Sequence, residues 1–203
     1  MIILRFCFTE TQLTHAEQHL FGLSIRDSLI RDFLPELTSP EFAASKSGKP
    51  YLLNSDAAYS ISHTDGCVMC ALKCHTYTCE LPPPLTDIIR SDGTYLAKSC
   101  DSHGEIGCDV EIWSQDRSES RLISISDRYF TEDETALLKS SNNIKRNFYK
   151  LWTEKESVLK CCGAGLSGLS RADTSEFSTK YKIYSFEIEQ GERKYSASIC
   201  SEL

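Results

Sequence analysis

The most constraining stretch of this chain is "LWTEKESVLKCCGAGLSGL", residues 151–169, in which a helical pattern runs directly into a group of glycines. Gly163, Gly165 and Gly168 spell G-x-G-x-x-G, the lettering of a dinucleotide-binding turn. That turn needs a strand before the glycines and a helix after them, because the helix N-terminus binds the pyrophosphate. Here the order is reversed, so we interpret Gly163 as a helix C-cap and Gly165 as part of the following loop. The sequence therefore argues against a dinucleotide-binding fold.

Hydrophobic periodicity divides the chain into strands and helices. Apolar runs predict strands at 1–8, 57–64, 67–73, 105–113, 181–189 and 194–201, and helical spacing predicts helices at about 14–33, within 114–130, at 131–140 and at about 144–162. Thr131 and Glu134 have the spacing of a capping box, which supports a helix start there. In the first helix we assign the buried stripe to a set that includes Leu20, Leu23 and Leu29.

The two halves of the chain share one order of elements: a strand, helical segments and a hairpin. This order predicts an α+β fold built from two similar α/β subdomains, residues 1–104 and residues 105–203. Three consecutive prolines at 82–84 and the pair Asp92-Gly93 indicate a long insertion or flexible loop at 74–104. We therefore expect a duplicated unit whose halves are separated by an insertion.

The overall composition argues against two classes of protein. The 203 residues carry a net charge of −7, which disfavours a nucleic-acid-binding protein with a broad basic face. No apolar run reaches the length of a membrane span, and the apolar first residues predict a strand rather than a signal peptide. We therefore expect a cytoplasmic protein that binds neither nucleic acid nor membrane.

Ten cysteines raise the alternative of a zinc site. Cys67, Cys70, Cys74 and Cys79, together with His75, have suggestive spacing. However, Cys67 and Cys70 lie three apart in a predicted strand, so their side chains point to opposite faces and do not converge on one metal ion. We expect reduced thiols, which pack as small apolar groups or lie at the surface.

Acidic side chains from two distant segments have the spacing of a shared site. Asp109 and Glu111 are two apart on a predicted strand, so both carboxylates lie on the same face, opposite an apolar one. Glu156 and Lys160 are four apart on a predicted helix and share one side of it. If these elements meet, the three carboxylates predict a hard-cation site of the kind that magnesium prefers. The alternatives are a solvated strand face and a surface ion pair.

Lys155 falls on the apolar stripe of the same predicted helix. An unpaired ammonium group in a core would be costly, so we expect Lys155 to have a partner. That partner is either a carboxylate or a bound phosphate, and the sequence leaves both open.

Five motifs in order carry a resemblance to a known family. They are "GKP" at 48–50, "YSISHT" at 59–64, "IGCDVE" at 106–111, "RYFTEDE" at 128–134 and "LWTEKESVLK" at 151–160. Together they resemble the 4'-phosphopantetheinyl transferase superfamily, of the surfactin-synthetase-activating (Sfp) type. The family pattern is a G-x-D-x-E strand followed by a W-[ST]-x-K-E-[SA]-x-x-K helix. The similarity extends over about 48–169, apart from the insertion.

The resemblance implies both a fold and an activity. The implied fold has two subdomains related by pseudo-twofold symmetry, in a monomer with pseudo-dimeric architecture. The implied enzyme is a magnesium-dependent transferase that moves 4'-phosphopantetheine from coenzyme A to a serine of an apo acyl or peptidyl carrier protein. It releases adenosine 3',5'-bisphosphate and serves fatty acid or secondary metabolite biosynthesis.

By the same resemblance, the charged residues have expected roles. Asp109, Glu111 and Glu156 would hold magnesium against the pyrophosphate of coenzyme A. Glu156 would also be the base that takes the proton from the acceptor serine. Lys160 and Lys155 would bind coenzyme A and offset the phosphate charge that shifts to the leaving group.

The nucleotide end of coenzyme A has expected contacts of its own, namely Lys49, Ser62 and His63. The alternatives are that Lys49 is an ordinary turn lysine and that His63 is a core histidine. Relatives usually carry an arginine- and lysine-rich stretch before the first long helix as well. This chain has "TETQLTHAEQH" at 9–19 instead, which departs from that pattern.

Acidic carrier proteins would require a local basic patch despite the negative total charge. Arg117, Arg121 and Arg128 follow Glu111 at helical spacing and are candidates for this patch. Solvated surface arginines are the alternative.

Three other functions remain open from the sequence. Asp27-Ser28-Leu29 is the triplet that acyl carrier proteins offer for attachment, so the chain could be a substrate instead of an enzyme. The same three carboxylates would also suit another magnesium-dependent phosphoryl or nucleotidyl transferase. The missing basic stretch fits a catalytically inactive relative that binds coenzyme A.

Overall fold

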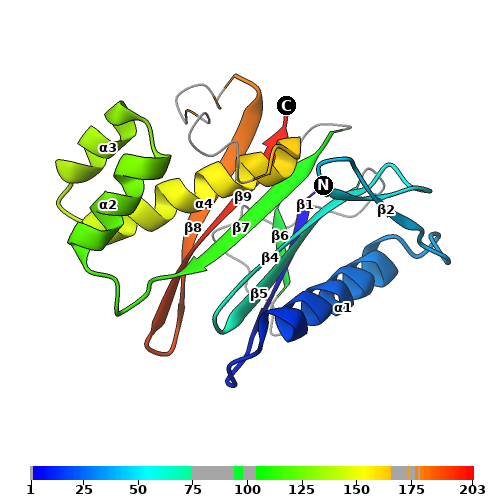
Figure 1. The fold of residues 1–203 in the computed structure, drawn as a ribbon. Helices are drawn as coiled ribbons and strands as arrows, with labels where there is room; N and C mark the ends of the chain where they lie inside the picture. Colours follow the sequence, from blue (N-terminus) through cyan, green and yellow to red (C-terminus); the bar gives the residue numbers. More distant parts are fainter. Residues whose placement is uncertain (1, 75–93, 98–103, 166–172, 174–176, 178) are drawn as a thin grey trace.

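The computed structural model describes residues 2–74, 94–97, 104–165, 173, 177 and 179–203 (Figure 1). The helices are α1 (His15–Phe33), α2 (Glu119–Tyr129), α3 (Glu132–Lys139) and α4 (Ile144–Cys162). The strands are β1 (Ile2–Phe8), β2 (Phe42–Ala44), β3 (Pro50–Leu52), β4 (Ala58–Thr64), β5 (Cys67–Lys73), β6 (Thr94–Ala97), β7 (Ile106–Ile112), β8 (Tyr181–Gln190) and β9 (Arg193–Glu202).

Local signals place the helix ends close to where the sequence predicts them. α1 begins after Thr14, whose side chain accepts a hydrogen bond from the Glu17 amide in a capping box. Thr131 and Glu134 form the same capping box at the start of α3, as predicted. α4 ends at Gly163, which has a φ of 70°. This left-handed conformation favours glycine and confirms the C-cap interpretation.

The strands form two larger antiparallel sheets with matching orders. The first has the order β4-β5-β1-β6 and the second the order β7-β9-β8, and β2 pairs with β3 in a separate hairpin. In both sheets the second strand of a hairpin, β5 or β9, lies between its hairpin partner and the strand that opens that half. The fold is therefore mixed α/β with antiparallel sheets, while a twofold relation between the halves stays a prediction.

The packing is layered, with the two sheets inside and long helices outside (Figure 1). One face of β1 and β5 packs against β7 and β9 in a shared apolar core. α1 covers the other face of the first sheet, and α4 covers the outer face of the second. α2 and α3 pack against the N-terminal part of α4. The functional consequence is that α1 and α4 flank the line where β4 meets β7.

The buried stripe of α1 differs from the predicted one. Leu20 is 65% exposed, and the buried positions include Gly22, Ile25, Arg26 and Leu29. A Cβ atom at Gly22 would lie 2.6 Å from the Cγ2 atom of Ile61, so α1 packs very closely on β4 at this glycine. The predicted stripe is confirmed at Leu29 and Ile30 but wrong at Leu20. It missed Gly22 and Arg26 because hydrophobic periodicity does not count a glycine or an arginine.

The predicted insertion at 74–104 is described only in part. Thr94–Ala97 forms β6, which pairs with β1 at the edge of the first sheet, so the loop interpretation is wrong for these residues. Residues 75–93 and 98–103 of that prediction, with His75 and Cys79, lie outside the described residues, as does Gly168. β2 and β3, three residues each, were too short for periodicity to indicate.

No helix in the described ranges has the length and apolar character that a membrane span requires.

Candidate active site

The site begins with Gly107, which allows α4 to lie directly against β7. A Cβ atom at this position would lie 2.0 Å from the carbonyl oxygen of Ser157 and 2.4 Å from the amide nitrogen of Cys161. Such contacts with helix backbone could be relieved only by moving the helix, so glycine is required here. The close approach brings the side chain of Lys160, on α4, to Asp109, two residues along β7.

Asp109 is the centre of a buried polar cluster. Its side chain is buried, and its Oδ1 atom accepts hydrogen bonds from the Lys160 ammonium at 2.7 Å and from the Ser62 hydroxyl at 2.8 Å. The Lys160 ammonium also donates to the Ser62 hydroxyl at 3.0 Å. The other carboxylate oxygen, Oδ2, is buried and has no hydrogen-bond partner in the described part of the chain.

Glu111 and Glu156 complete a group of three interacting carboxylates. Burial and then the negative charge of Asp109 raise the pKa of Glu156 to about 7, while Lys160 acts in the opposite direction. Burial and the Asp109 charge likewise raise the pKa of Glu111 to about 7, with Lys160 and Arg117 opposing. The raised pKa values of Glu111 and Glu156, next to the Asp109 carboxylate, indicate that this group has too little positive charge nearby.

Lys160 alone therefore does not balance this group. Burial lowers the pKa of Lys160, but the Asp109 carboxylate more than offsets this effect, so the pKa lies above its ordinary value and the lysine stays charged. In the described ranges, no three His, Cys, Asp or Glu side chains already stand in the arrangement of a metal site. The unpartnered Oδ2 of Asp109 and the excess negative charge nevertheless suit a divalent cation.

Lys155, five residues earlier on α4, has a different environment from Lys160. Its side chain is fully buried, and its ammonium forms an ion pair of 2.6 Å with Glu134 on α3. Of the two predicted partners, the carboxylate is the one found in the structure. Lys155 is absent from the lining of the cavity described next, so its predicted contact with coenzyme A has no support in this geometry.

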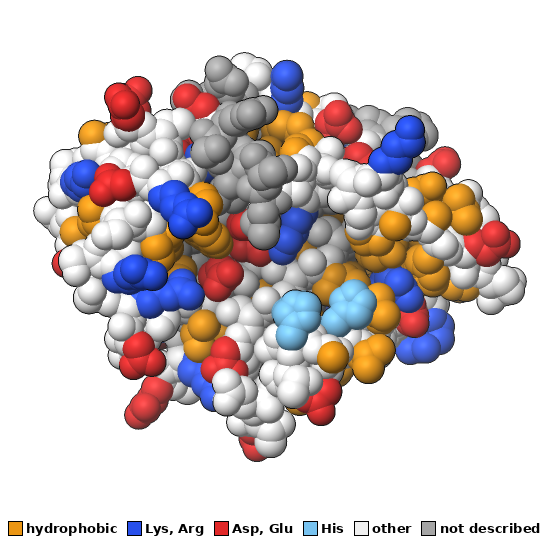
Figure 2. All heavy atoms as spheres, in the orientation of Figure 1, with side chains coloured by type: hydrophobic (Ala, Val, Ile, Leu, Met, Phe, Trp, Pro, Cys, Tyr) orange, Lys and Arg blue, Asp and Glu red, His pale blue; other side chains and the backbone are white. Residues whose placement is uncertain are grey.

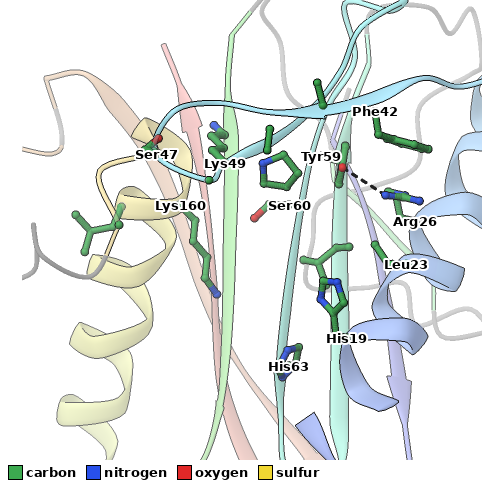
Figure 3. A pocket seen from close by; sticks show the side chains of 18 of the residues that line it. His19, Leu23, Arg26, Phe42, Ser47, Lys49, Tyr59, Ser60, His63 and Lys160 are labelled. Atoms are coloured by element: carbon green, nitrogen blue, oxygen red, sulfur yellow. Dashed lines mark hydrogen bonds between the residues drawn. The ribbon is translucent and has the colours of Figure 1, made fainter. Parts of the chain in front are cut away.

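A cavity of about 710 Å³ lies beside the carboxylate group, between α1 and α4. Figure 3 shows Lys160 on the α4 side, the β2–β3 turn with Lys49 above, and His19 and His63 on the opposite side. Glu156 and Lys160 form part of the same wall. On the surface, acidic and basic side chains gather at the centre of this face, with histidines beside them toward α1 (Figure 2). The cavity is therefore lined by residues from both halves of the chain and lies next to the charged cluster.

The three residues that were predicted to contact the nucleotide end of coenzyme A have three different surroundings. His63 lines the cavity, and burial and then the nearby His15 and Lys160 lower its pKa, so it is mostly neutral near pH 7. Lys49 also lines the cavity, but its ammonium pairs with Glu105 at 2.5 Å and donates to the carbonyl oxygen of Cys161. Ser62 is buried beneath the cavity and is bound to Asp109 and Lys160.

Several cavity residues were missed by the sequence analysis. Arg26 on α1 is buried, with its guanidinium group 3.6 Å from the ring centre of Phe42, and it donates to the Tyr59 hydroxyl at 3.4 Å (Figure 3). His15 stacks edge-on against His63, with ring centres 4.8 Å apart, and His19 lies one turn along α1. The correct phase of α1 would have revealed Arg26, because it places this residue on the face toward β4.

These α1 residues bear on the departure noted in the N-terminal segment. The segment at 9–19 lacks arginine and lysine, yet α1 supplies Arg26 and His19 to the cavity wall. In this chain, the basic side chains on this wall of the cavity therefore come from α1 itself and not from the segment that precedes it.

Of the three arginines predicted to form a basic patch, Arg117 is close enough to Glu111 to lower its pKa. Arg121 and Arg128 are exposed on α2, and the Arg128 guanidinium lies 5.2 Å from the ring centre of Tyr129. A role in carrier binding stays a prediction.

The cysteine and serine alternatives can also be compared with the structure. Cys67 and Cys70 belong to different core clusters on the two faces of β5, as expected, and neither of these two thiols forms a disulfide. Ser28 lies within α1, where its hydroxyl donates to the carbonyl oxygen of Ile25 and accepts a hydrogen bond from Arg5. A serine held inside a helix in this way does not suit the attachment point of a carrier protein.

Comparison with known proteins gives one consistent result. A model of the 4'-phosphopantetheinyl transferase superfamily matches residues 105–200. The chain is 33% identical over 97 residues to a Synechocystis sp. protein named "putative 4'-phosphopantetheinyl transferase", which covers 46% of this chain and 38% of that protein. It is 28% identical over 127 residues to a 4'-phosphopantetheinyl transferase of Aneurinibacillus migulanus, which covers 62% of this chain and 39% of the relative. The chain matches about two fifths of the length of these relatives.

Proposed function

We propose that the chain is a member of the 4'-phosphopantetheinyl transferase superfamily, whose model it matches over residues 105–200, and that it transfers 4'-phosphopantetheine from coenzyme A to a serine of an apo acyl or peptidyl carrier protein. The observation that carries this proposal is the group formed by Asp109, Glu111, Glu156 and Lys160 at the edge of the inter-half cavity. A volume of about 710 Å³ is in the range of cofactor sites.

Three carboxylates would hold the magnesium ion of this reaction. Asp109 would contribute the Oδ2 atom that has no partner in the described residues, and Glu111 and Glu156 would contribute carboxylates that burial and mutual repulsion keep from ionising. When bound, the cation would neutralise the pyrophosphate of coenzyme A and allow all three groups to be charged together.

Glu156 is the proposed general base. In the chain without a cation its pKa is about 7, so this carboxylate is more basic than that of an ordinary glutamate and better able to accept a proton from a hydroxyl. The serine proton passes to Glu156, and the serine oxygen forms a bond to the phosphorus atom that carries pantetheine. The bond from that phosphorus to the bridging oxygen breaks, and adenosine 3',5'-bisphosphate leaves with the electron pair.

Lys160 is the proposed cationic partner of the leaving group. Its side chain is one third exposed and faces the cavity, so its ammonium can approach a ligand without leaving Asp109. An ammonium group held in place before the reaction stabilises charge that develops during it.

The nucleotide end of coenzyme A is proposed to lie along the α1 side of the cavity. His63, His19 and Arg26 line this side and can donate hydrogen bonds to phosphate oxygens or contact a base. Lys49, at the β2–β3 turn, would reach the same ligand if it exchanged its contact with Glu105. Ser62 is too deeply buried for direct contact, so its role is proposed to be indirect.

The test is a transfer assay with the purified chain, magnesium, coenzyme A and a panel of apo carrier proteins from fatty acid and peptide synthesis. Carriers that gain the mass of phosphopantetheine, together with release of adenosine 3',5'-bisphosphate, would support the proposal. Tight binding of coenzyme A without any mass gain would favour an inactive relative. Thermal protection by nucleoside triphosphates but not by coenzyme A would favour a different phosphoryl or nucleotidyl transferase.

A further inference from the structure

β4 and β7 meet through side-chain hydroxyls rather than through backbone pairing. Three hydroxyl groups at every second position of β4, those of Ser60, Ser62 and Thr64, face β7. They accept hydrogen bonds from the amides of Cys108, Val110 and Ile112 at 3.0, 3.2 and 3.3 Å. Each partner lies 48 positions further along the chain, so the two strands advance in step. This hydroxyl ladder joins the N-terminal half to the strand that carries the acidic residues.

Two of these hydroxyls perform a second task. Ser62 donates to Oδ1 of Asp109 at 2.8 Å, and Thr64 donates to Oε2 of Glu111 at 3.4 Å, each 47 positions away. The third hydroxyl, that of Ser60, has Gly107 at the equivalent position, which offers no side chain. The ladder is therefore regular in its backbone contacts, but it binds a carboxylate only at the two acidic residues.

Hydrogen-bond capacity at Ser62 makes its contact with Asp109 directional. A hydroxyl has one proton to donate and two lone pairs that accept. At Ser62 the Val110 amide and the Lys160 ammonium donate to the oxygen, so its proton is directed to Asp109. Oδ1 of Asp109 then accepts two hydrogen bonds, and Oδ2 is left without a partner among the described residues.

We propose that Ser62 and Thr64 are positioning residues that orient the Asp109 and Glu111 carboxylates toward a divalent cation. The inference rests on the proposed function, since it takes these carboxylates as the metal ligands. It assigns the N-terminal half a direct part in building the metal site, although all three proposed ligands belong to the C-terminal half.

Binding of Mn²⁺ to the purified chain, followed by the electron paramagnetic resonance signal of the free ion, tests this inference without depending on turnover. Ser62→Ala is expected to weaken Mn²⁺ binding by about 10-fold or more, the usual effect of removing a hydrogen bond to a metal ligand. Thr64→Val, which removes the longer contact, is expected to weaken it by only about threefold. Ser62→Thr retains a hydroxyl and is expected to bind nearly as well as the unaltered chain.

Ser60→Ala is the matched control, because it removes the same kind of ladder contact next to Gly107 instead of beside a carboxylate. It is expected to lower thermal stability about as much as Ser62→Ala does, while its Mn²⁺ affinity stays within about twofold of the unaltered chain. If Ser62→Ala fails to fold, Ser62→Cys preserves the volume with a weaker donor and is expected to show the same loss of affinity.

The outcomes separate this inference from the proposed function. An Mn²⁺ affinity in Ser62→Ala that equals that of the unaltered chain would overturn the positioning role and leave the metal assignment intact. Failure of the unaltered chain to bind Mn²⁺ would overturn both. Equal losses of affinity in Ser60→Ala and Ser62→Ala would show that the ladder acts only through the fold, which also contradicts the positioning role.

Discussion

Two lysines on α4 form ion pairs of nearly equal length in two regions of the molecule. Lys155 lies 2.6 Å from Glu134, where α4 packs on α3, and Lys160 lies 2.7 Å from Asp109, where α4 packs on β7. The side chain of Lys155 is 0% exposed, whereas that of Lys160 is 33% exposed and borders the cavity. The nitrogen–oxygen distance alone would not distinguish the two ion pairs, but the solvent exposure of the lysine does.

The surroundings of the two pairs differ as much as their exposure. Glu134 accepts the Thr131 amide at the start of α3 as well as the Lys155 ammonium, and the Phe130 ring lies 5.3 Å from that ammonium. Lys160 instead has Glu156 beside it in addition to Asp109. The first pair ties together two helices, and the second leaves excess negative charge facing a cavity. We infer that the first is structural and the second functional.

The largest expected effect on folding comes from breaking the structural pair. Lys155→Ala should reduce the free energy of unfolding by about 4 kcal/mol, because it leaves a carboxylate buried without its cation. Chemical denaturation would measure this loss. Replacing both partners, as Lys155→Met with Glu134→Gln, keeps a cap for α3 and should recover most of the stability. A loss below about 1 kcal/mol in Lys155→Ala would contradict the structural assignment.

In the functional region, the largest expected effect is on turnover. Glu156→Gln should lower kcat by about 100-fold or more, because the amide cannot accept the serine proton, while the far-ultraviolet circular dichroism spectrum stays unchanged. The transfer assay would measure the rate. Near-normal rates would exclude Glu156 as the base. Glu154→Gln, two residues earlier and bonded to Ser185 instead of facing the carboxylate group, provides a neighbouring comparison on the same helix.

A smaller effect should appear in the pH dependence of stability. The pKa of Glu156 in the folded chain, about 7, lies above its ordinary value of 4.5, so the folded state binds more protons than the unfolded state between these values. The free energy of unfolding should therefore fall as pH rises from about 5 to about 7, by on the order of 2 kcal/mol. Glu156→Gln should remove the share of this decline that belongs to Glu156 and leave that of Glu111, whose pKa is also raised to about 7, and added magnesium should reduce the decline in the unaltered chain. A flat profile in the unaltered chain would contradict the raised pKa.

The smallest expected effect concerns an exposed pair near the structural one. Lys139 on α3 pairs with Asp127 on α2 at 2.8 Å, and both side chains are about half exposed. Lys139→Ala should change the free energy of unfolding by less than about 0.5 kcal/mol, because water and salt screen such pairs. Thermal unfolding at two salt concentrations would measure it. A loss comparable to that of Lys155→Ala would undermine the use of burial to rank these pairs.

Much of the local structure could be predicted from the sequence. Period-two alternation placed Asp109 and Glu111 on one face of a strand whose other face is core, and the structure confirms this arrangement. Capping residues and the glycine at 163 marked the helix ends. Where prediction failed, as in the buried stripe of α1, the reason was a glycine selected for close packing rather than for hydrophobicity.

The predicted site was less complete than the predicted elements. The sequence indicated that Lys155 needs a partner but did not identify Glu134, which lies 21 positions away on another helix. It selected Ser62 as a contact for coenzyme A, whereas the structure buries this residue between Asp109 and Lys160. The alternating hydroxyls of "YSISHT" were visible in the sequence, but nothing in it indicated that they face "IGCDVE".

The sequence by itself determined the helices, most of the strands, the face shared by the two strand carboxylates and, through its ordered motifs, the resemblance to one superfamily. These properties depend on residues that are near one another in the chain, and periodicity or spacing records them. Only the tertiary structure decided which lysine is sealed in the core, which faces the cavity, and how β4 meets β7. Those outcomes depend on the register between segments some fifty residues apart, which is set by packing of the two sheets and by the close approach at Gly107.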